Sequence, residues 1–314
     1  MTKETAITVA VLMGGVSSER EVSLHSGQGV AEGLRKAGFK VIETLVDSPD
    51  LSALEGKSVD VVFIALHGAF GEDGRLQRLL EEAGLPYTGC GPEASANAMD
   101  KIVSKRKFAE ADVPTAPYAV LTSAPSAADA AAVFGRFGPR VVVKPAAQGS
   151  SIGVSIVERD GFAEAVKQAL AFDGRAIVEP FIKGRELTVG ILGDKALPIV
   201  ELKPHRQFFD YTAKYQYGQT DYIVNPELPD DIAAEVSRAG LEAFRCLGCR
   251  DLGRVDVMLS ERGDIFVLEV NTIPGFTETS LVPMAASAAG MDFAALCRRI
   301  VEMALRRSAA ARTV

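Results

Sequence analysis

The first hundred residues of the chain alternate between strand-like and helix-like segments. Ile7–Met13 is an apolar run typical of a buried strand, and Gly14-Gly15 follows it as a turn. The pattern Ser18-x-x-Glu21 is that of a capping box, which predicts a helix that ends at about Lys36. Because strands that alternate with helices form parallel sheets, we predict a doubly wound α/β domain here. Its other elements are expected at Val41–Val46, Val59–Leu66 and Gly74–Ala83.

A ligand cleft is expected at one edge of this sheet. In an open α/β sheet, ligands bind in the crevice beyond the carboxyl ends of the strands. Gly14-Gly15 and His67-Gly68 follow two such strands. The pattern therefore predicts that these residues border a cleft.

The rest of the chain is less regular and combines hairpins with helices, which predicts an α+β arrangement towards the C-terminus. A hairpin is expected across Gly193-Asp194-Lys195, because Gly-Asp is a turn dipeptide. Lys203–Asn225 is polar and aromatic-rich with no clear period, and a loop of that length is usually a functional lid. Strands are expected at Arg140–Pro145, Ile152–Val157, Ala176–Ile182, Glu186–Leu192, Ala196–Leu202, Leu252–Leu259 and Ile265–Val270, and helices at Lys101–Ala111, Asp160–Ala171, Pro229–Leu247 and from Phe293 onward.

Length and composition limit the kind of protein. The 314 residues suffice for two or three domains, and the formal charge of −7 argues against a surface that neutralises nucleic-acid phosphates. The apolar runs are too short to span a membrane, and no signal-peptide pattern follows the apolar start. Four scattered cysteines do not form a disulfide framework, and the lone pair Cys246 and Cys249 is expected to be reduced and packed rather than a redox or zinc site. We expect a cytoplasmic protein without a nucleic-acid or membrane partner.

Two expected strands near the C-terminus carry unusual polar residues. Arg254 and Asp256 share one face of the first strand, and Glu269 and Asn271 share one face of the second. Antiparallel pairing would bring the two acids together, where they repel unless a cation lies between them. Oxygen ligands of this kind suit Mg²⁺. An internal ion network of Arg254 with the two acids explains the pattern equally well.

A small-residue connection follows the strand that ends at Lys144. Gln148–Ser151 and Gly153 let backbone N–H groups and hydroxyls approach a phosphate closely. The stretch matches neither the Walker pattern nor the GxGxxG fingerprint. Alone it would be a plain hairpin turn, but together with a lysine and a candidate metal cluster it favours phosphate binding.

Two further acids are candidates for contacts with a nucleotide. Glu179 lies near the end of one expected strand, directly before the sequence Pro-Phe-Ile, and Glu186 begins the next expected strand. They could supply acceptors for a base and for ribose hydroxyls. A surface linker between domains is the alternative, and the residues alone do not exclude it.

His67 stands at the end of a buried strand, before the acids Glu72 and Asp73. The other two histidines, His25 and His205, are far away in sequence, so a histidine metal cage is not expected. The chain has no GxSxG elbow, which disfavours a hydrolase triad. The bare pattern slightly favours a structural, hydrogen-bonded His67.

Taken together, the motifs resemble the D-alanine–D-alanine ligase family of the ATP-grasp superfamily over nearly the whole chain. Eight ordered motifs are far more specific than any single one. They are GGVSSEREVSL (14–24), HGAFGEDG (67–74), MDK (99–101), VVKPAAQGSSIGVS (142–155), EPFIKGREL (179–187), AKY (213–215), GRVDVM (253–258) and EVNTIPGFTETSLVP (269–283).

The resemblance implies a three-domain ATP-grasp architecture and a ligase that joins two D-alanines for peptidoglycan synthesis. ATP is the co-substrate, and an acyl phosphate of the first D-alanine is the intermediate. Two Mg²⁺ ions are implied as cofactors, with Mn²⁺ able to substitute, and a homodimer is the implied assembly. The implied domains are 1–98 (N-terminal α/β), 99–183 (central ATP-grasp) and 184–314 (C-terminal ATP-grasp, with a lid loop at 203–225).

The resemblance also implies which residues bind ATP and metal. The metal ligands are Asp256, Glu269 and Asn271. The phosphates contact three lysines beneath the Ser150-Ser151 loop, adenine contacts Glu179 and the backbone at Phe181 and Ile182, and ribose contacts Glu186. The implied ATP-binding residues are thus Lys101, Lys144, Ser151, Glu179, Phe181, Ile182, Glu186 and Lys214.

For D-alanine, the resemblance implies a second group of residues. Glu19 holds the first ammonium with His67 near the carboxylate, Arg254 and the Gly275 N–H stabilise the oxyanion, and the second carboxylate meets Ser280 and Leu281. Glu19, Ser150 and Tyr215 link the lid to the site. The implied catalytic residues are Glu19, Ser150, Tyr215, Arg254, Gly275 and Ser280, and the implied substrate-binding residues are His67 and Leu281.

Tyr215 bears on specificity. Related ligases that make a D-alanine–D-lactate ester lack the Lys-Tyr pair that stands here as Lys214 and Tyr215, so an amine is the implied second substrate. The alternative is an exposed loop aromatic. The chain departs from many relatives at Ala146–Gln148 and at Ile273, positions that touch no implied ligand.

Three other functions agree with parts of the sequence pattern. Another ATP-grasp carboxylate–amine ligase would keep the same ATP residues. A dinucleotide-binding oxidoreductase is suggested by the strand-Gly-Gly-helix start but lacks GxGxxG. A non-catalytic nucleotide-binding module would bind ATP without turnover.

Overall fold

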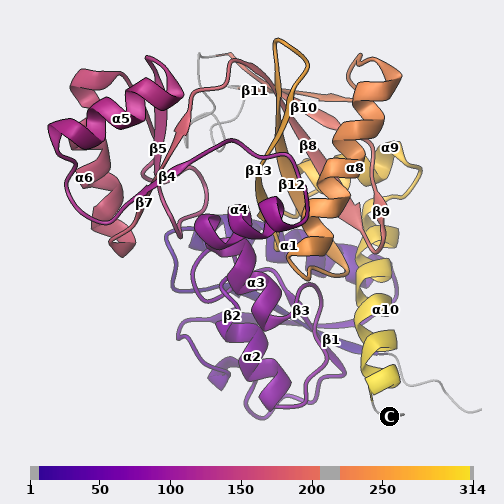
Figure 1. Cartoon of the computed structure of the whole chain (residues 1–314). Helices are drawn as coiled ribbons and strands as arrows, with labels where there is room; N and C mark the ends of the chain where they lie inside the picture. The colour runs from indigo at the N-terminus through magenta and orange to yellow at the C-terminus, as the bar shows by residue number, and fades with distance from the viewer. Residues whose placement is uncertain (1–6, 206–219, 312–314) are drawn as a thin grey trace, which may run out of the picture.

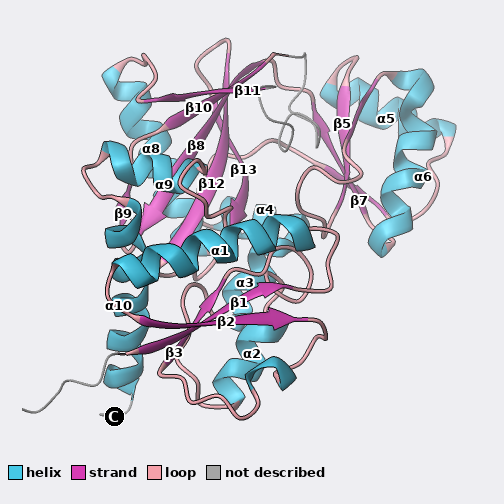
Figure 2. Ribbon diagram, turned by 180° about the vertical axis from the view of Figure 1, so that it is seen from behind, coloured by secondary structure: helices cyan, strands magenta, loops and turns pink. Residues whose placement is uncertain are grey.

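The computed structural model describes residues 7–205 and 220–311, which form three β-sheets with helices around them (Figure 1). Two of the sheets lie one above the other with the first long helix between them, and the third forms a separate lobe (Figure 2). The predicted mixture of an N-terminal α/β part and a C-terminal α+β part is confirmed.

The N-terminal sheet is parallel, as predicted. The central strand β1 (Thr8–Gly14) is buried throughout and pairs in parallel with β2 (Lys40–Val46) and β3 (Val61–Ile64). A parallel sheet that is covered on both faces needs nearly continuous apolar strands, and β1 and β3 have them. The helices that follow the strands in this part are α1 (Arg20–Lys36), η1 (Ser52–Leu54), α2 (Arg75–Glu82) and α3 (Pro92–Met99).

Helix α1 does not begin with the predicted capping box. It starts at Arg20 after Glu19, and no side chain caps it. Instead, Ser17 Oγ donates a hydrogen bond to the carbonyl oxygen of His67 at 2.7 Å, and the Glu19 carboxylate accepts one from Ser150 Oγ. The side chains at this helix start therefore bind distant segments, which a local capping pattern cannot anticipate.

The second sheet forms the separate lobe. Its order is β4-β7-β5-β6, every pair is antiparallel, and α5 and α6 cover one side of it (Figure 1). An apolar core that includes Val143, Phe162 and Val178 fills the space between them. The elements are β4 (Ala119–Leu121), α5 (Ala127–Phe137), β5 (Val141–Pro145), β6 (Ser155–Val157), η2 (Arg159–Gly161), α6 (Phe162–Asp173) and β7 (Ala176–Pro180), and α4 (Lys101–Glu110) leads into the lobe.

The third sheet is antiparallel and contains the predicted hairpin, with Thr188 opposite Val200. The order is β11-β10-β8-β12-β13, and β9 also pairs with β8. The predicted loop Lys203–Asn225 is wrong over its last part, because that part forms β11 and pairs with β10. Strand pairing between two separate segments gives no recognisable pattern in a short polar sequence. Residues 206–219 of that loop lie outside the described residues. The strands are β8 (Gly184–Leu192), β9 (Lys195–Ala196), β10 (Val200–Pro204), β11 (Thr220–Val224), β12 (Leu252–Ser260) and β13 (Ile265–Asn271).

The last part of the chain returns to the first. The helices after β11 are α8 (Asp230–Cys246), α9 (Leu281–Ala288) and α10 (Phe293–Ala311). Leu296 and Ile300 of α10 share one core with Val30 and Leu34 of α1. The sequence pattern does not predict helices α3, α5 and α9. Over the ranges 7–205 and 220–311, none of the helices is long and apolar enough to cross a membrane.

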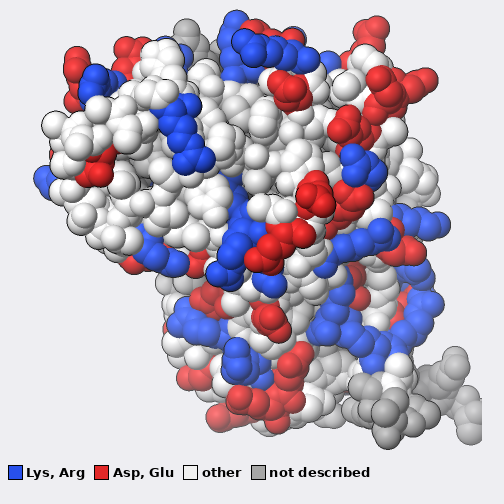
Figure 3. Space-filling model, viewed as in Figure 1, with Lys and Arg blue, Asp and Glu red and all other residues white. Residues whose placement is uncertain are grey.

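Acidic and basic side chains are interspersed over the face of the molecule shown in Figure 3. The excess of acid in the composition is therefore not gathered there into one large field.

Candidate active site

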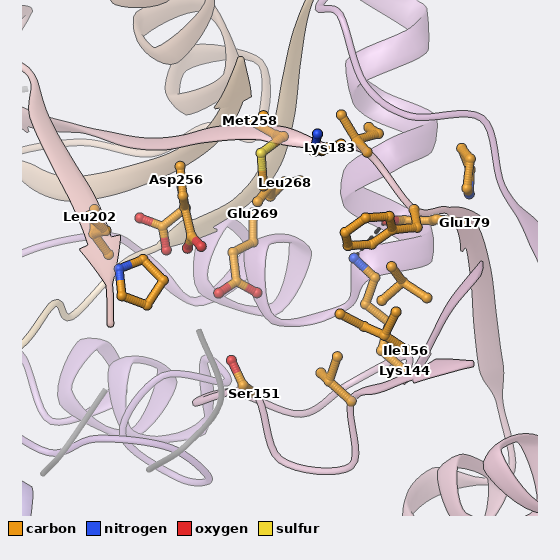
Figure 4. Close-up of a pocket in the computed structure, with 18 of the residues that line it drawn as sticks. Lys144, Ser151, Ile156, Glu179, Lys183, Leu202, Asp256, Met258, Leu268 and Glu269 are labelled. Carbon is orange, nitrogen blue, oxygen red and sulfur yellow. Dashed lines mark ion pairs between the residues drawn. The ribbon is translucent and has the colours of Figure 1, made fainter. Parts of the chain in front are cut away.

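A cavity of about 730 Å³ lies between the lobe and the third sheet. That volume is typical of small-molecule sites. In Figure 4, Asp256 and Glu269 lie on one side of it, Lys144 and Glu179 on the other, and Ser151 below. The sequence-predicted residues that line the cavity are Lys101, Lys144, Ser151, Glu179, Phe181, Ile182, Glu186, Asp256 and Glu269.

Part of the cavity wall is apolar. Val142 and Ile156 face it from β5 and β6, and Met258 and Leu268 face it from β12 and β13. Apolar side chains on two opposed sheets form a slot suited to a flat ring. The sequence analysis did not identify these residues, because a half-buried apolar position in a strand has the same pattern whether it faces a core or a ligand.

Glu179 lies between two lysines at the lobe side of the cavity. Its Oε2 is 2.7 Å from Lys144 Nζ, and its Oε1 is 2.9 Å from Lys105 Nζ. Lys105 is almost wholly buried, and it also donates to Thr115 Oγ1 at 2.7 Å. The acid therefore fixes Lys144 at the edge of the cavity, while Lys105 supplies a second countercharge from behind.

The charges of this trio depend on one another. Burial raises the pKa of the Glu179 carboxyl, but Lys144 and Lys105 outweigh it and hold that pKa below its ordinary value. Burial lowers the pKa of Lys105, and the nearby Glu179 partly offsets this effect. Lys105 was missed in the sequence because nothing in the local pattern distinguishes it from Lys101 and Lys107, the other lysines of α4.

The polar residues of β12 and β13 meet as predicted. Asp256 stands directly opposite Glu269, and Arg254 opposite Asn271. Arg254 donates to both carboxylate oxygens of Asp256 at 2.8 Å, and Asn271 Nδ2 donates to Oδ2 at 3.2 Å. Thr188 Oγ1 donates to Oδ1 at 2.8 Å. Asp256 is thus held rigidly by its neighbours, which corresponds to part of the predicted ion network.

Glu269 takes no part in that Arg–Asp pair. One of its oxygens lies 3.2 Å from Lys101 Nζ, and the side chain lines the cavity. Within the described ranges, no group of three or more His, Cys, Asp or Glu side chains is arranged to hold a metal ion. Mg²⁺ commonly binds through one or two carboxylates and completes its shell with substrate oxygens and water. Asp256, Glu269 and the amide of Asn271 fit such an incomplete oxygen site.

A second, smaller hollow adjoins the large cavity. Lys101, Gln148 and Glu269 line both of them. The smaller hollow is also lined by Glu72 and Asn271. The two spaces therefore adjoin at the three shared residues.

Glu19 and Ser150 come together near this junction. Glu19 is buried, and its carboxylate accepts the hydrogen bond of Ser150 Oγ. Gly68 has φ +72°, and a Cβ on it would lie only 2.7 Å from Glu19 Oε2, so glycine permits this close approach. Ser150 and Ser151 have φ +52° and +58°, a conformation that non-glycine residues adopt rarely and that occurs at functional loops.

Glu72 is an acid that the sequence analysis placed near His67 without a role of its own. Its Oε1 lies 3.4 Å from His67 Nδ1. Burial raises the pKa of the Glu72 carboxyl; the hydrogen bond from His67 opposes this and the nearby Glu19 reinforces it. The signal that could have found it is its spacing from His67 at the end of β3.

Glu72→Gln should make the protein more stable at neutral pH, relative to wild type. Because the folded pKa of Glu72 lies above the unfolded value, ionisation of this acid destabilises the fold as the pH rises from the ordinary carboxyl pKa through the raised one. The melting temperatures of variant and wild type should therefore agree in acid and diverge, in favour of the variant, with rising pH. The exposed Glu82→Gln is the control and should show little difference. A variant that loses stability at neutral pH would contradict this account.

The remaining predicted residues lie in the segment after β13 or outside the described residues. Gly275 and Ser280 belong to the turn that leads into α9, where Ser280 Oγ accepts a hydrogen bond from the backbone N–H of Thr277 at 2.9 Å, and Leu281 is the first residue of α9. Lys214 and Tyr215 fall in 206–219, so their positions are not described. His67 is buried in the connection that follows β3, and its Nδ1 lies 3.0 Å from the carbonyl oxygen of Ile273 in this segment.

Two family models match the chain. The model described as "D-ala D-ala ligase C-terminus" matches residues 108–302, and "D-ala D-ala ligase N-terminus" matches residues 46–90. The first match alone covers both the lobe and the third sheet.

Individual relatives match over nearly the whole length. The D-alanine–D-alanine ligase of Geotalea uraniireducens is 46% identical over 94% of this chain and 95% of its own. That of Methylacidiphilum infernorum is 42% identical over 95% of this chain and 96% of its own. Among solved structures, the D-alanine–D-alanine ligase of Bacillus anthracis complexed with ATP superposes with a TM-score of 0.85 at 32% identity, covering 96% of this chain and 99% of the other.

Proposed function

The chain belongs to the D-alanine–D-alanine ligase family, and we propose that it joins two molecules of D-alanine into D-alanyl-D-alanine while ATP is cleaved to ADP and phosphate. The dipeptide serves peptidoglycan synthesis. The observation that carries the proposal is one cavity with lysines on one side and paired carboxylates on the other.

In this proposal ATP occupies the large cavity. Its base lies in the apolar slot beside Glu179, and the backbone at Phe181 and Ile182 contacts its edge. Glu186 binds the ribose. Lys101 and Lys144 contact the phosphates, and Lys214 and Ser151 join them from the loops. The ion pair between Lys144 and Glu179 supports this placement, because it holds a cation ready at the cavity wall.

Two Mg²⁺ ions are proposed at Asp256, Glu269 and Asn271, where Mn²⁺ can substitute. Bound there, they would supply positive charge to neutralise the triphosphate. Arg254 keeps Asp256 oriented, and Lys101 balances the charge of Glu269.

The chemistry follows from the poor leaving ability of a carboxylate oxygen. The γ-phosphoryl group moves to a carboxylate oxygen of the first D-alanine and gives an acyl phosphate. The amine of the second D-alanine then attacks the carbonyl carbon, and phosphate leaves as the amide forms. Arg254 and the Gly275 N–H stabilise the negative oxygen of the tetrahedral intermediate.

The two D-alanines lie beside the phosphate end of the ATP cavity, between the start of α1 and the segment that leads into α9. Glu19 binds the ammonium group of the first D-alanine, with His67 near its carboxylate. Ser280 and Leu281 receive the carboxylate of the second. Ser150 and Tyr215 link the lid loop to Glu19, and the Lys-Tyr pair of that loop selects an amine rather than a hydroxyl as nucleophile. The hydrogen bond between Ser150 and Glu19 supports this arrangement.

The direct test is an assay of ADP release with ATP, Mg²⁺ and D-alanine, in which the product is identified by mass spectrometry. L-Alanine is the matched control, because it carries the same groups in mirror image. D-Alanine-dependent release of ADP with formation of the dipeptide is expected. Turnover only with other amino acids would indicate another carboxylate–amine ligase, and ATP binding without turnover would indicate a binding module.

The proposal also includes the setting of the enzyme. We place it in the cytoplasm, where ATP is available, as a homodimer with domains at 1–98, 99–183 and 184–314. Sedimentation equilibrium tests the homodimer, and a single-chain mass at assay concentrations would exclude it.

A further inference from the structure

The segment that carries Gly275 connects β13 to α9, in the C-terminal part of the chain. Glycine at this position leaves its backbone free to turn unless neighbouring groups hold it. An N–H that stabilises an oxyanion has to be held in place before the reaction. The contacts of Ile273, two residues before it, and of Phe276, directly after it, show what holds it.

His67 fixes the segment on one side of Gly275. Its Nδ1 lies 3.0 Å from the carbonyl oxygen of Ile273. A carbonyl oxygen only accepts, so Nδ1 carries the hydrogen and donates it. In the neutral ring, Nε2 is then an acceptor, and it lies 3.0 Å from Ser26 Oγ.

Ser26 fixes the segment on the other side. The backbone N–H of Phe276 donates to Ser26 Oγ at 3.2 Å. The Ser26 hydroxyl hydrogen is therefore free to point at His67 Nε2, which needs a donor. Ser26 is buried at 1% exposure, so water does not replace these bonds at the hydroxyl.

Phe276 is also anchored by packing. Its ring lies 5.8 Å from that of Phe63 on β3 and 5.6 Å from that of Phe293 on α10, measured between centroids. Phe276 is buried in the core that β1, α1 and α10 share. Gly275 thus lies between two residues that the N-terminal part of the chain holds.

From these contacts we infer that Ser26 is a positioning residue for the Gly275 backbone N–H, acting through a relay that runs from Phe276 N–H to Ser26, His67 and the Ile273 carbonyl. The inference rests on the proposed function, which gives the Gly275 N–H its role. Ser26 lines neither of the two cavities described above. Through these hydrogen bonds, Ser26 and His67 hold the turn before α9 against the N-terminal part of the chain. The N-terminal part therefore sets the position of the Gly275 N–H in the C-terminal part.

The chain offers a matched control on the same helix. Ser23, one turn earlier on α1, is fully buried and makes the same kinds of bond. Its Oγ donates to the Ala65 carbonyl at 2.7 Å and accepts from the Gly14 N–H at 2.9 Å. Ser23→Ala therefore removes an equally buried hydroxyl without touching the relay.

Amide exchange measured by NMR separates the two serines without any substrate. In Ser26→Ala, the Phe276 amide should exchange about tenfold faster while the Gly14 amide is unchanged, because one hydrogen bond is worth about that factor. Ser23→Ala should show the reverse. Equal protection of the Phe276 amide in wild type and Ser26→Ala would overturn the relay.

The histidine tautomer gives a second test that needs no serine variant. In wild-type protein with ¹⁵N-labelled histidine, the His67 ring should carry its hydrogen on Nδ1, and His67→Gln identifies the signals among the three histidines. Hydrogen on Nε2 would overturn the inference. Because neither NMR readout depends on turnover, failure here is distinguishable from failure of the proposed ligase function.

Kinetics then show whether the relay matters for the reaction. Ser26→Ala should lower kcat about tenfold to a hundredfold with little change in KM for ATP, since a small misplacement in an active site has effects of that size. Ser23→Ala should keep most of the wild-type kcat at a similar loss of melting temperature. Equal kcat values for the two variants would mean that Ser26 is only structural.

Discussion

Glu269→Gln is expected to lower turnover at least about a hundredfold while the fold remains intact. Mutation of residues that only hydrogen-bond to metal ligands commonly lowers metal affinity or activity about tenfold to a hundredfold. Glu269 is proposed as a ligand itself. The amide keeps the shape of the side chain but removes one of the two negative charges opposed across β12 and β13. Steady-state ADP release at saturating ATP and D-alanine measures the loss, and the melting temperature checks the fold.

The matched control for this variant lies on the same hairpin. Asp264→Asn removes a negative charge from the exposed turn between β12 and β13, away from the cavity. It should turn over at the wild-type rate. If Glu269→Gln did so too at ordinary Mg²⁺ concentrations, the metal assignment would be wrong.

Glu179→Gln is expected to reduce the free energy of unfolding by about 3 kcal/mol, the lower end of what removal of one partner from a buried ion pair costs. The side chains of Lys105 and Lys144 are only 1% and 11% exposed, and both would lose their countercharge. Because the folded pKa of Glu179 lies below its ordinary value, its stabilisation is present above that value and is lost as the pH falls through the lowered pKa. The gap between wild type and variant should close in that acid range.

Urea unfolding measures this prediction, and an exposed ion pair provides the comparison. Glu43 pairs with Arg35 at 2.6 Å, but both side chains are more than 40% exposed. Glu43→Gln should therefore cost less than about 1 kcal/mol. Similar losses in the two variants would show that the Glu179 trio is no more important for stability than a surface pair.

The parts of the fold that could be predicted from the sequence are those with a strong local pattern. The parallel N-terminal sheet follows from its apolar strands, and the alternation of faces in β12 and β13 places Asp256 opposite Glu269. In both cases the spacing within one or two short segments carries the information. The roles assigned to the individual site residues remain predictions.

The rest depends on contacts between distant segments. Lys105 lies on a helix whose other lysines are less buried, and only its place beneath Glu179 distinguishes it. The predicted capping box of Ser18 and Glu21 does not form, because α1 begins only at Arg20 and has no side-chain cap, so the local pattern there was misleading. Likewise, Ser26 and Phe276 are 250 positions apart, and no spacing rule connects them.

The central claim is that this cavity activates the carboxylate of D-alanine by phosphorylation, and an isotope experiment tests it most directly. The enzyme is supplied with ATP, Mg²⁺ and D-alanine labelled with ¹⁸O in its carboxylate. The mass of the released phosphate is then measured by mass spectrometry. Because the acyl phosphate forms through a carboxylate oxygen that leaves with the phosphoryl group, each phosphate should carry one ¹⁸O atom alongside an equal amount of dipeptide. Dipeptide formed together with unlabelled phosphate would contradict the account.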